Sequence, residues 1–155
     1  MTLALVAALV APGPAAALSC IRTTPTDAFQ RADESPDRYV VVHGRLDFDQ
    51  SRAPEGYDED ASDVTLPARL SGQALNRDGF TTPFDVSLDL TLQCAGPWCG
   101  TIARDVDQLL FVKVLDRGYA LEIGACPGNA FANPSQGDLD AMVECLGGAC
   151  VVERE

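Results

Sequence analysis

FDVSLDLTLQC, residues 84–94, has the most regular pattern in this sequence. Apolar side chains at every second position, from Phe84 to Leu92, alternate with polar ones. A period of two is typical of a β-strand that buries one face and exposes the other. The stretch therefore predicts a half-buried strand, which needs neighbouring strands to complete its sheet.

Two candidate neighbours precede it in the chain. YVVVHGRLDF, residues 39–48, also alternates, and VTLPARLSGQAL, residues 64–75, is a weaker strand in which Pro67 favours a sheet edge or a bulge. NRDG at 76–79 supplies a turn into the next strand. The inner face of the first stretch is predicted to carry Val40, Val42, Gly44, Leu46 and Phe48.

Two further strands follow and resemble a hairpin. LLFVKVL (109–115) and YALEIGA (119–125) are separated by the turn residues Asp116, Arg117 and Gly118. Five strands with turn-rich connections predict a mainly β fold that closes into a small barrel.

Helices are predicted at both ends of this run of strands. Thr24 can cap a short first helix that starts at Pro25 and buries Ala28. Ser135 and Asp138 have the spacing of a capping box for a second helix. Apolar residues then follow at helical spacing and two glycines end the helix: Leu139, Met142, Val143, Leu146, Gly147 and Gly148.

The first 17 residues are typical of a secretory signal peptide. They carry no charge, contain an apolar stretch too short for a membrane span, and end in Ala15-Ala16-Ala17, a small-residue cleavage site. We expect cleavage before Leu18 and export to the periplasm or the exterior. A lipid anchor on Cys20 is the alternative. Residues 18–155 then form a single domain.

The charge of the chain limits the class of partner. The 155 residues include 23 acidic and 11 basic side chains, and the net charge of −12 lies entirely beyond residue 17. This balance argues against nucleic acid or an anionic membrane as partner, and leaves basic or cationic partners open.

The six cysteines favour disulfides. An even number in an exported chain is typical of three disulfide bonds. CAGPWC (94–99) and CLGGAC (145–150) could instead form a four-cysteine zinc site, but their spacing is loose and an oxidising compartment removes thiolates. PWCGT (97–101) lacks the second cysteine of a redox dithiol.

Three other features are candidate sites. His43, the one histidine, has no evident catalytic partner and is predicted to lie on the surface. Residues 47–63 carry seven carboxylates without EF-hand spacing, which favours a solvated loop over a calcium site. Trp98 lies between two cysteines, so it either packs on their disulfide or serves as a binding anchor.

The order of elements and cysteines resembles the inhibitory domain of the tissue inhibitors of metalloproteinases and the related netrin-like modules. That family has a five-stranded OB-fold barrel. The resemblance covers most of residues 18–146 and rests on CIRTTPTDAFQRAD (20–33), the valine-rich strand that starts at Tyr39, Cys99-Gly100, and Cys126. Within it, Cys20 corresponds to the second cysteine of the family's opening Cys-X-Cys, and Ala28-Phe29 and Ala32-Asp33 match similar pairs.

The chain differs from the family at the position of the first cysteine, on which the family's inhibitory activity depends. The family chelates a protease's zinc through the amine and carbonyl of its first cysteine, but here Leu18 holds that position, and Gln30 replaces another cysteine. The resemblance then implies the pairs Cys20–Cys126, Cys94–Cys99 and Cys145–Cys150.

The resemblance implies an exported, non-enzymatic binding domain. Its partner would be a protein, a metalloprotease being the family's target, inhibited weakly through Leu18 with Ser19 in the pocket beside the zinc. The alternative is a general protein- or ligand-binding module that uses Trp98 or the loop at 47–63. No catalytic residue, cofactor or resident metal is predicted.

Overall fold

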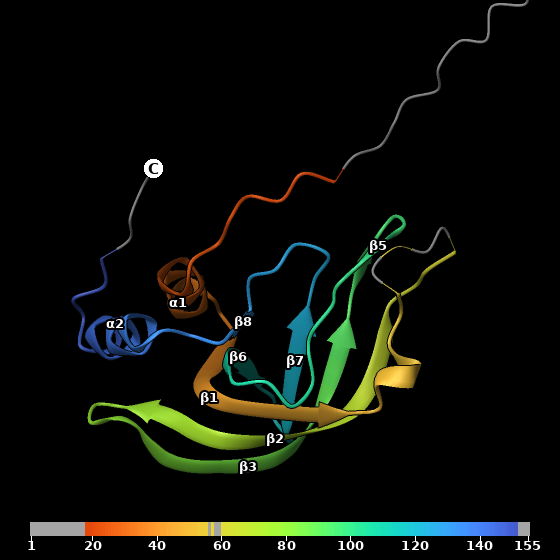
Figure 1. Cartoon of the computed structure of the whole chain (residues 1–155). Coiled ribbons are helices and arrows are strands. Elements are labelled where there is room, and N and C mark those ends of the chain that lie inside the picture. The colour runs from red at the N-terminus through yellow and green to blue at the C-terminus, as the bar shows by residue number, and fades with distance from the viewer. Residues whose placement is uncertain (1–17, 56, 58–59, 152–155) are drawn as a thin grey trace, which may run out of the picture.

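The computed structural model describes residues 18–55, 57 and 60–151. The predicted signal peptide, residues 1–17, lies outside this part of the chain. Figure 1 shows two helices beside a curved sheet. The helices and strands of five residues or more are α1 (Pro25–Glu34), β1 (Arg38–Phe48), β2 (Val64–Asn76), β3 (Gly79–Leu92), β6 (Gln108–Val114), β7 (Tyr119–Ile123) and α2 (Gln136–Leu146).

The five predicted strands are present and form a ring. Their order is β1-β2-β3-β7-β6, and β6 pairs back onto β1, with Val42 opposite Leu110. All neighbours are antiparallel except β3 and β7, which run parallel with Leu90 opposite Leu121. The ring explains the period of two in 84–94, because one face of each strand lines its interior.

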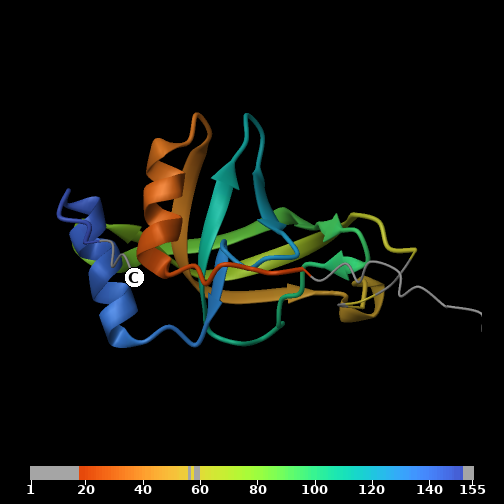
Figure 2. The same cartoon turned by 90° about the horizontal axis from the view of Figure 1, so that it is seen from above.

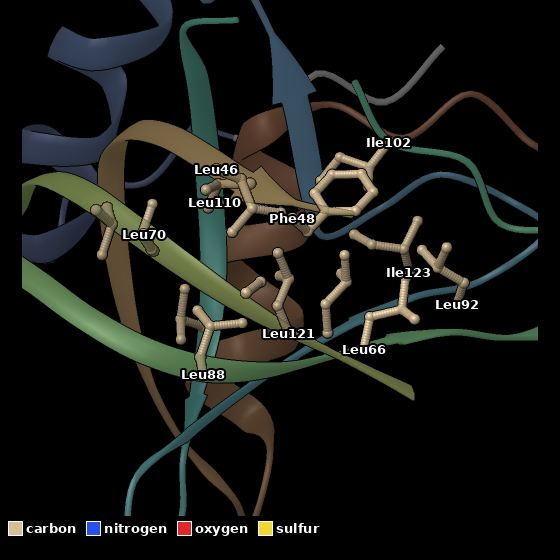
Figure 3. Close-up of a cluster of buried hydrophobic side chains, with 14 of the residues drawn as sticks. Leu46, Phe48, Leu66, Leu70, Leu88, Leu92, Ile102, Leu110, Leu121 and Ile123 are labelled. Carbon is tan, nitrogen blue, oxygen red and sulfur yellow. The ribbon is translucent and has the colours of Figure 1, made fainter. Parts of the chain in front are cut away.

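The interior of the ring is a continuous apolar core (Figure 3). Leucines from all five strands are completely buried there, and the ring of Phe48 is 5% exposed. These leucines are Leu46, Leu66, Leu70, Leu90, Leu92, Leu110 and Leu121.

A second core lies outside the ring, where the helices pack on β1 and β6. Val41, Leu109 and Phe111 point outward from these strands and meet Ala28 of α1 and Met142 of α2. Both faces of β1 and β6 are therefore covered, which explains why LLFV is a continuous apolar run rather than an alternating one.

The helices begin where the sequence predicts, but their positions differ from the expectation in two respects. Thr24 and Ser135 are the N-caps, and Gly147 is the C-cap of α2. However, α1 has 10 residues and is nearly as long as the 11-residue α2, whereas a short first helix was predicted. The helices, which the run of strands separates in the chain, also lie together at one side of the sheet (Figure 2).

Pro67 marks a local sheet edge and not a bulge. It pairs with Asp89 of β3 but has no partner in β1, because the pairing of β2 with β1 begins at the next residue, Ala68. The irregularity of the β2–β3 ladder lies between Ala74 and Leu75. A proline is tolerated at position 67 because no strand requires its missing N–H on the β1 side.

Short elements complete the fold, and the sequence analysis did not anticipate them. Strand β8 (Ala130–Ala132) adds to β6, and β4 (Cys94–Ala95) and β5 (Trp98–Cys99) form a separate two-stranded hairpin. A 3-10 turn, η1 (Gln50–Arg52), follows β1. No helix in the described ranges is long and apolar enough to cross a membrane.

Three disulfides join Cys20 to Cys126, Cys94 to Cys99 and Cys145 to Cys150. These are the pairs expected from the sequence. The first connects residues 106 positions apart, whereas each of the others spans 5. Disulfides of this kind are typical of proteins in an oxidising environment.

Candidate functional site

The segment before α1 is exposed and extended. Residues 18–24 form no helix or strand and cross one end of the ring in both views (Figures 1 and 2). The backbone of residues 18–23 makes no hydrogen bond with another described residue. Leu18 is 39% exposed and Ile21 is 89% exposed. Both backbone and apolar side chains are thus available to a partner.

One covalent bond and a well-supported loop hold this segment in place. Cys20 is bonded to Cys126 in the loop between β7 and β8. Arg31 of α1 donates a hydrogen bond from Nη2 to the carbonyl of Gly128 in that loop, at 2.8 Å. Asn129 donates from Nδ2 to the carbonyl of Glu122, at 3.0 Å. The loop is therefore tied to both a helix and a strand, and it serves as a firm attachment for the disulfide.

The β4–β5 hairpin is attached to the strand that leads into the same loop. The amide of Gln93 donates to the carbonyl of Ile123 at 2.9 Å, and the amide of Gly100 donates to the carbonyl of Gln93 at 2.8 Å. A Cβ at position 100 would lie only 2.0 Å from the oxygen of Ile123. Glycine is required here because the backbones approach so closely.

Trp98 and Tyr57 connect the hairpin to the β1–β2 connection. Their rings meet edge to face with centroids 4.8 Å apart, and the two residues form an isolated antiparallel bridge. Asp63 accepts a hydrogen bond from the amide of Cys94 at 2.8 Å. Trp98 is half-buried and Tyr57 is 50% exposed, so Tyr57 presents more surface to a partner than the tryptophan does.

We call residues 18–23, Tyr57 and the hairpin at 94–99 the N-terminal edge. Three of the five exposed large apolar side chains in the described part belong to it, namely Leu18, Ile21 and Tyr57. Such a combination of extended backbone and apolar side chains suits binding to another protein. Leu18 and Ser19, two of the binding residues predicted from the sequence, lie in the extended segment of this edge, and the third, Trp98, lies in its hairpin.

Two of the carboxylates in residues 47–63 have separate structural roles, and Asp58 and Glu59 lie outside the described residues. Asp47 is paired with Arg104 at 2.7 Å. Asp49 caps η1, and hydrogen bonds from the hydroxyl and amide of Ser51 lower the pKa of its carboxyl group. Across the described ranges, no group of three or more His, Cys, Asp or Glu side chains is arranged to hold a metal ion.

His43 belongs to a different part of the surface. Its ring meets that of Phe80 edge to face, with centroids 5.9 Å apart. Both line an open groove of about 630 Å³ between the β2–β3 turn and α2, together with Gln136 and Asp140. A second open groove, of about 490 Å³, lies between α1 and the start of β1. Neither is continuous with the N-terminal edge.

Comparisons with protein-family models, curated proteins and solved structures find no match to this chain. The chemistry of its surface must therefore be argued from its own residues. Two members of the N-terminal edge, Ile21 and Tyr57, were not singled out from the sequence. An isolated isoleucine or tyrosine carries no sequence signal of exposure, because most such side chains are buried.

Proposed function

We propose that this chain is an exported, non-enzymatic binding domain with an OB-fold barrel, and that it binds a protein partner through the N-terminal edge. The fold proposal is supported by the closed order of the strands and by the parallel pair β3–β7. The localisation proposal is supported by the three disulfides and by residues 1–17 of the sequence.

One observation carries the functional proposal. An extended segment, whose backbone makes no hydrogen bond within the described part of the chain, is fixed two residues beyond Leu18 by a disulfide that spans most of the domain. Fixing a binding segment in advance reduces the entropy that is lost on association. Unpaired backbone groups can then add to a partner as a strand does.

Inhibition of a zinc metalloprotease is the more specific form of this proposal. If cleavage leaves Leu18 as the first residue, its amine and carbonyl can ligate a zinc ion in the partner, and Ser19 follows as the first side chain beyond the metal. The segment is constrained at Cys20 but not at Leu18. We therefore expect weak inhibition.

The test compares chains that differ only at the amine. The native chain starting at Leu18, a version with one extra alanine in front, and the Leu18→Ala variant are assayed against a panel of secreted zinc metalloproteases. The extra residue displaces the amine by about 3.5 Å and should abolish inhibition. Leu18→Ala keeps the amine in place and should still inhibit.

A general binding module is the second candidate, because Tyr57 and Trp98 offer an aromatic contact on the same edge. In that case the alanine extension has no effect on binding, whereas Tyr57→Ala weakens it. Equal binding by the native and extended chains would rule out chelation while leaving the N-terminal edge as the interface.

A further inference from the structure

Strand β3 has a long edge that no described strand covers. It pairs with β2 along its whole length, but with β7 only from Asp89 to Leu92. Residues 80–88 therefore have a neighbour on one side only. Figure 1 shows this part of β3 at the bottom of the view, whereas residues 18–24 cross the top. We call residues 83–88 the open edge.

Two prolines reveal which backbone groups face outward. Pro67 opposes Asp89 and Pro83 opposes Gln73 in one uninterrupted register. A proline cannot donate to the ladder, so both pairs must be of the type that exchanges no hydrogen bonds. Hydrogen-bonded and non-hydrogen-bonded pairs alternate along an antiparallel ladder, so Asp85 and Ser87, which lie at even spacing between Pro83 and Asp89, are also in non-hydrogen-bonded pairs. Their N–H and C=O groups therefore point away from β2, toward the open side.

The side chains along the open edge alternate in character. Phe84 and Val86 are half-buried and pack against the core, and the ring of Phe84 meets that of Tyr119 at a centroid distance of 5.1 Å. Asp85 and Ser87 are exposed on the opposite face. An added strand would find apolar neighbours on its inner face and polar ones on its outer face.

The outer face carries one carboxylate without a counter-ion in the described chain, because the charge of Asp85 is already matched by Arg69. Asp85 pairs with Arg69 at 2.8 Å, and Ser71 also donates to it. The side chain of Asp89, at the point where β7 begins to pair with β3, is exposed and has neither a hydrogen bond nor an ion pair with another described residue. Opposite charges across neighbouring strands stabilise a sheet, and like charges destabilise it. A basic side chain on the added strand would therefore be favoured.

We propose that the open edge binds an extended segment of another protein in which apolar and basic residues alternate. Main-chain hydrogen bonds to Asp85 and Ser87 would supply affinity, and the alternation would supply specificity. A second copy of this chain fits less well, because each copy brings its own Asp85 and Asp89 and a net charge of −12. This surface is independent of the N-terminal edge.

The binding test uses a short labelled peptide of alternating lysine and valine with the mature chain, followed by fluorescence anisotropy. We expect saturable binding. N-methylation of alternate peptide amides removes the donors and should weaken binding about tenfold or more. A peptide of the same composition with its lysines grouped together should also bind more weakly.

Variants of Ser87 test the protein side of the contact. Ser87→Pro removes the outward N–H without touching the β2 ladder and should weaken binding, whereas Ser87→Ala keeps the N–H and should bind as the native chain does. If Ser87→Pro does not fold, the N-methylated peptide decides alone. The proposal is overturned if all peptides bind equally, if none binds, or if the chain pairs with itself through this edge.

Discussion

The segments that flank the helices at the two ends of the domain are held in opposite ways. The backbone of residues 18–23 makes no hydrogen bond to the rest of the described chain, and one disulfide to a cysteine 106 positions away holds the segment. Residues 147–150 follow α2 and are held locally, because Gly147, Gly148 and Ala149 donate to carbonyls of the last helical turn and Cys150 is bonded to Cys145.

This difference shows what each end can do. The C-terminal end closes a helix and can form as soon as α2 forms. The N-terminal end is placed only when the ring brings the β7–β8 loop to it. A segment that is held by a disulfide to a residue distant in the chain, and whose backbone groups are not hydrogen-bonded within the described chain, is well suited to binding a partner protein.

The largest expected effect comes from removing the long disulfide. In the chain-entropy model, a loop of this length stabilises the fold by about 4.7 kcal/mol, whereas a loop closed over 5 positions contributes about 2 kcal/mol. Urea unfolding of the paired variants Cys20→Ser/Cys126→Ser and Cys145→Ser/Cys150→Ser measures both. Equal losses would show that the two ends are constrained to the same degree.

The second prediction tests whether the packing of α2 on the ring, and not only its disulfide, stabilises the helix in the fold. Met142 is completely buried between α2 and the outer face of the ring, so Met142→Ala should cost about 3 kcal/mol. Leu146 is on the same helix but 42% exposed, so Leu146→Ala should cost less than about 1 kcal/mol. Thermal unfolding separates the two, and similar losses would contradict the proposed second core.

The smallest effect concerns the start of α1, next to the N-terminal segment. The hydroxyl and amide of Thr24 donate to the carboxylate of Asp27, at 2.7 and 2.8 Å, and these bonds lower the pKa of Asp27. A lowered folded pKa stabilises the protein at pH values above the unfolded pKa, about 3.9, and that stabilisation is lost as the pH falls through the folded pKa.

Asp27→Asn should therefore reduce the melting temperature at about pH 6 but hardly at about pH 2. Asp33→Asn is the control, because Asp33 is on the same helix and its side chain makes no hydrogen bond with another described residue. A loss from Asp27→Asn that is independent of pH would mean that the carboxylate charge does not stabilise the cap.

Local patterns accounted for much of the secondary structure. The alternation in 84–94, the turn at 76–79 and the caps at Thr24 and Ser135 all depend on residues close together in the chain. For the same reason β8 was missed, because three residues, Ala130–Ala132, are too short to show a period and become a strand only by pairing with β6.

By itself, the sequence determined which stretches become the five long strands and the two α-helices, since periodicity and capping act over a few residues. It left the candidate surfaces undecided. The attachment of the hairpin at Gly100, the side-by-side helices and the uncovered part of β3 depend on residues that are distant in the chain. Only the tertiary structure decided these, because closing the ring determines which strand edges are paired and which remain open to a partner.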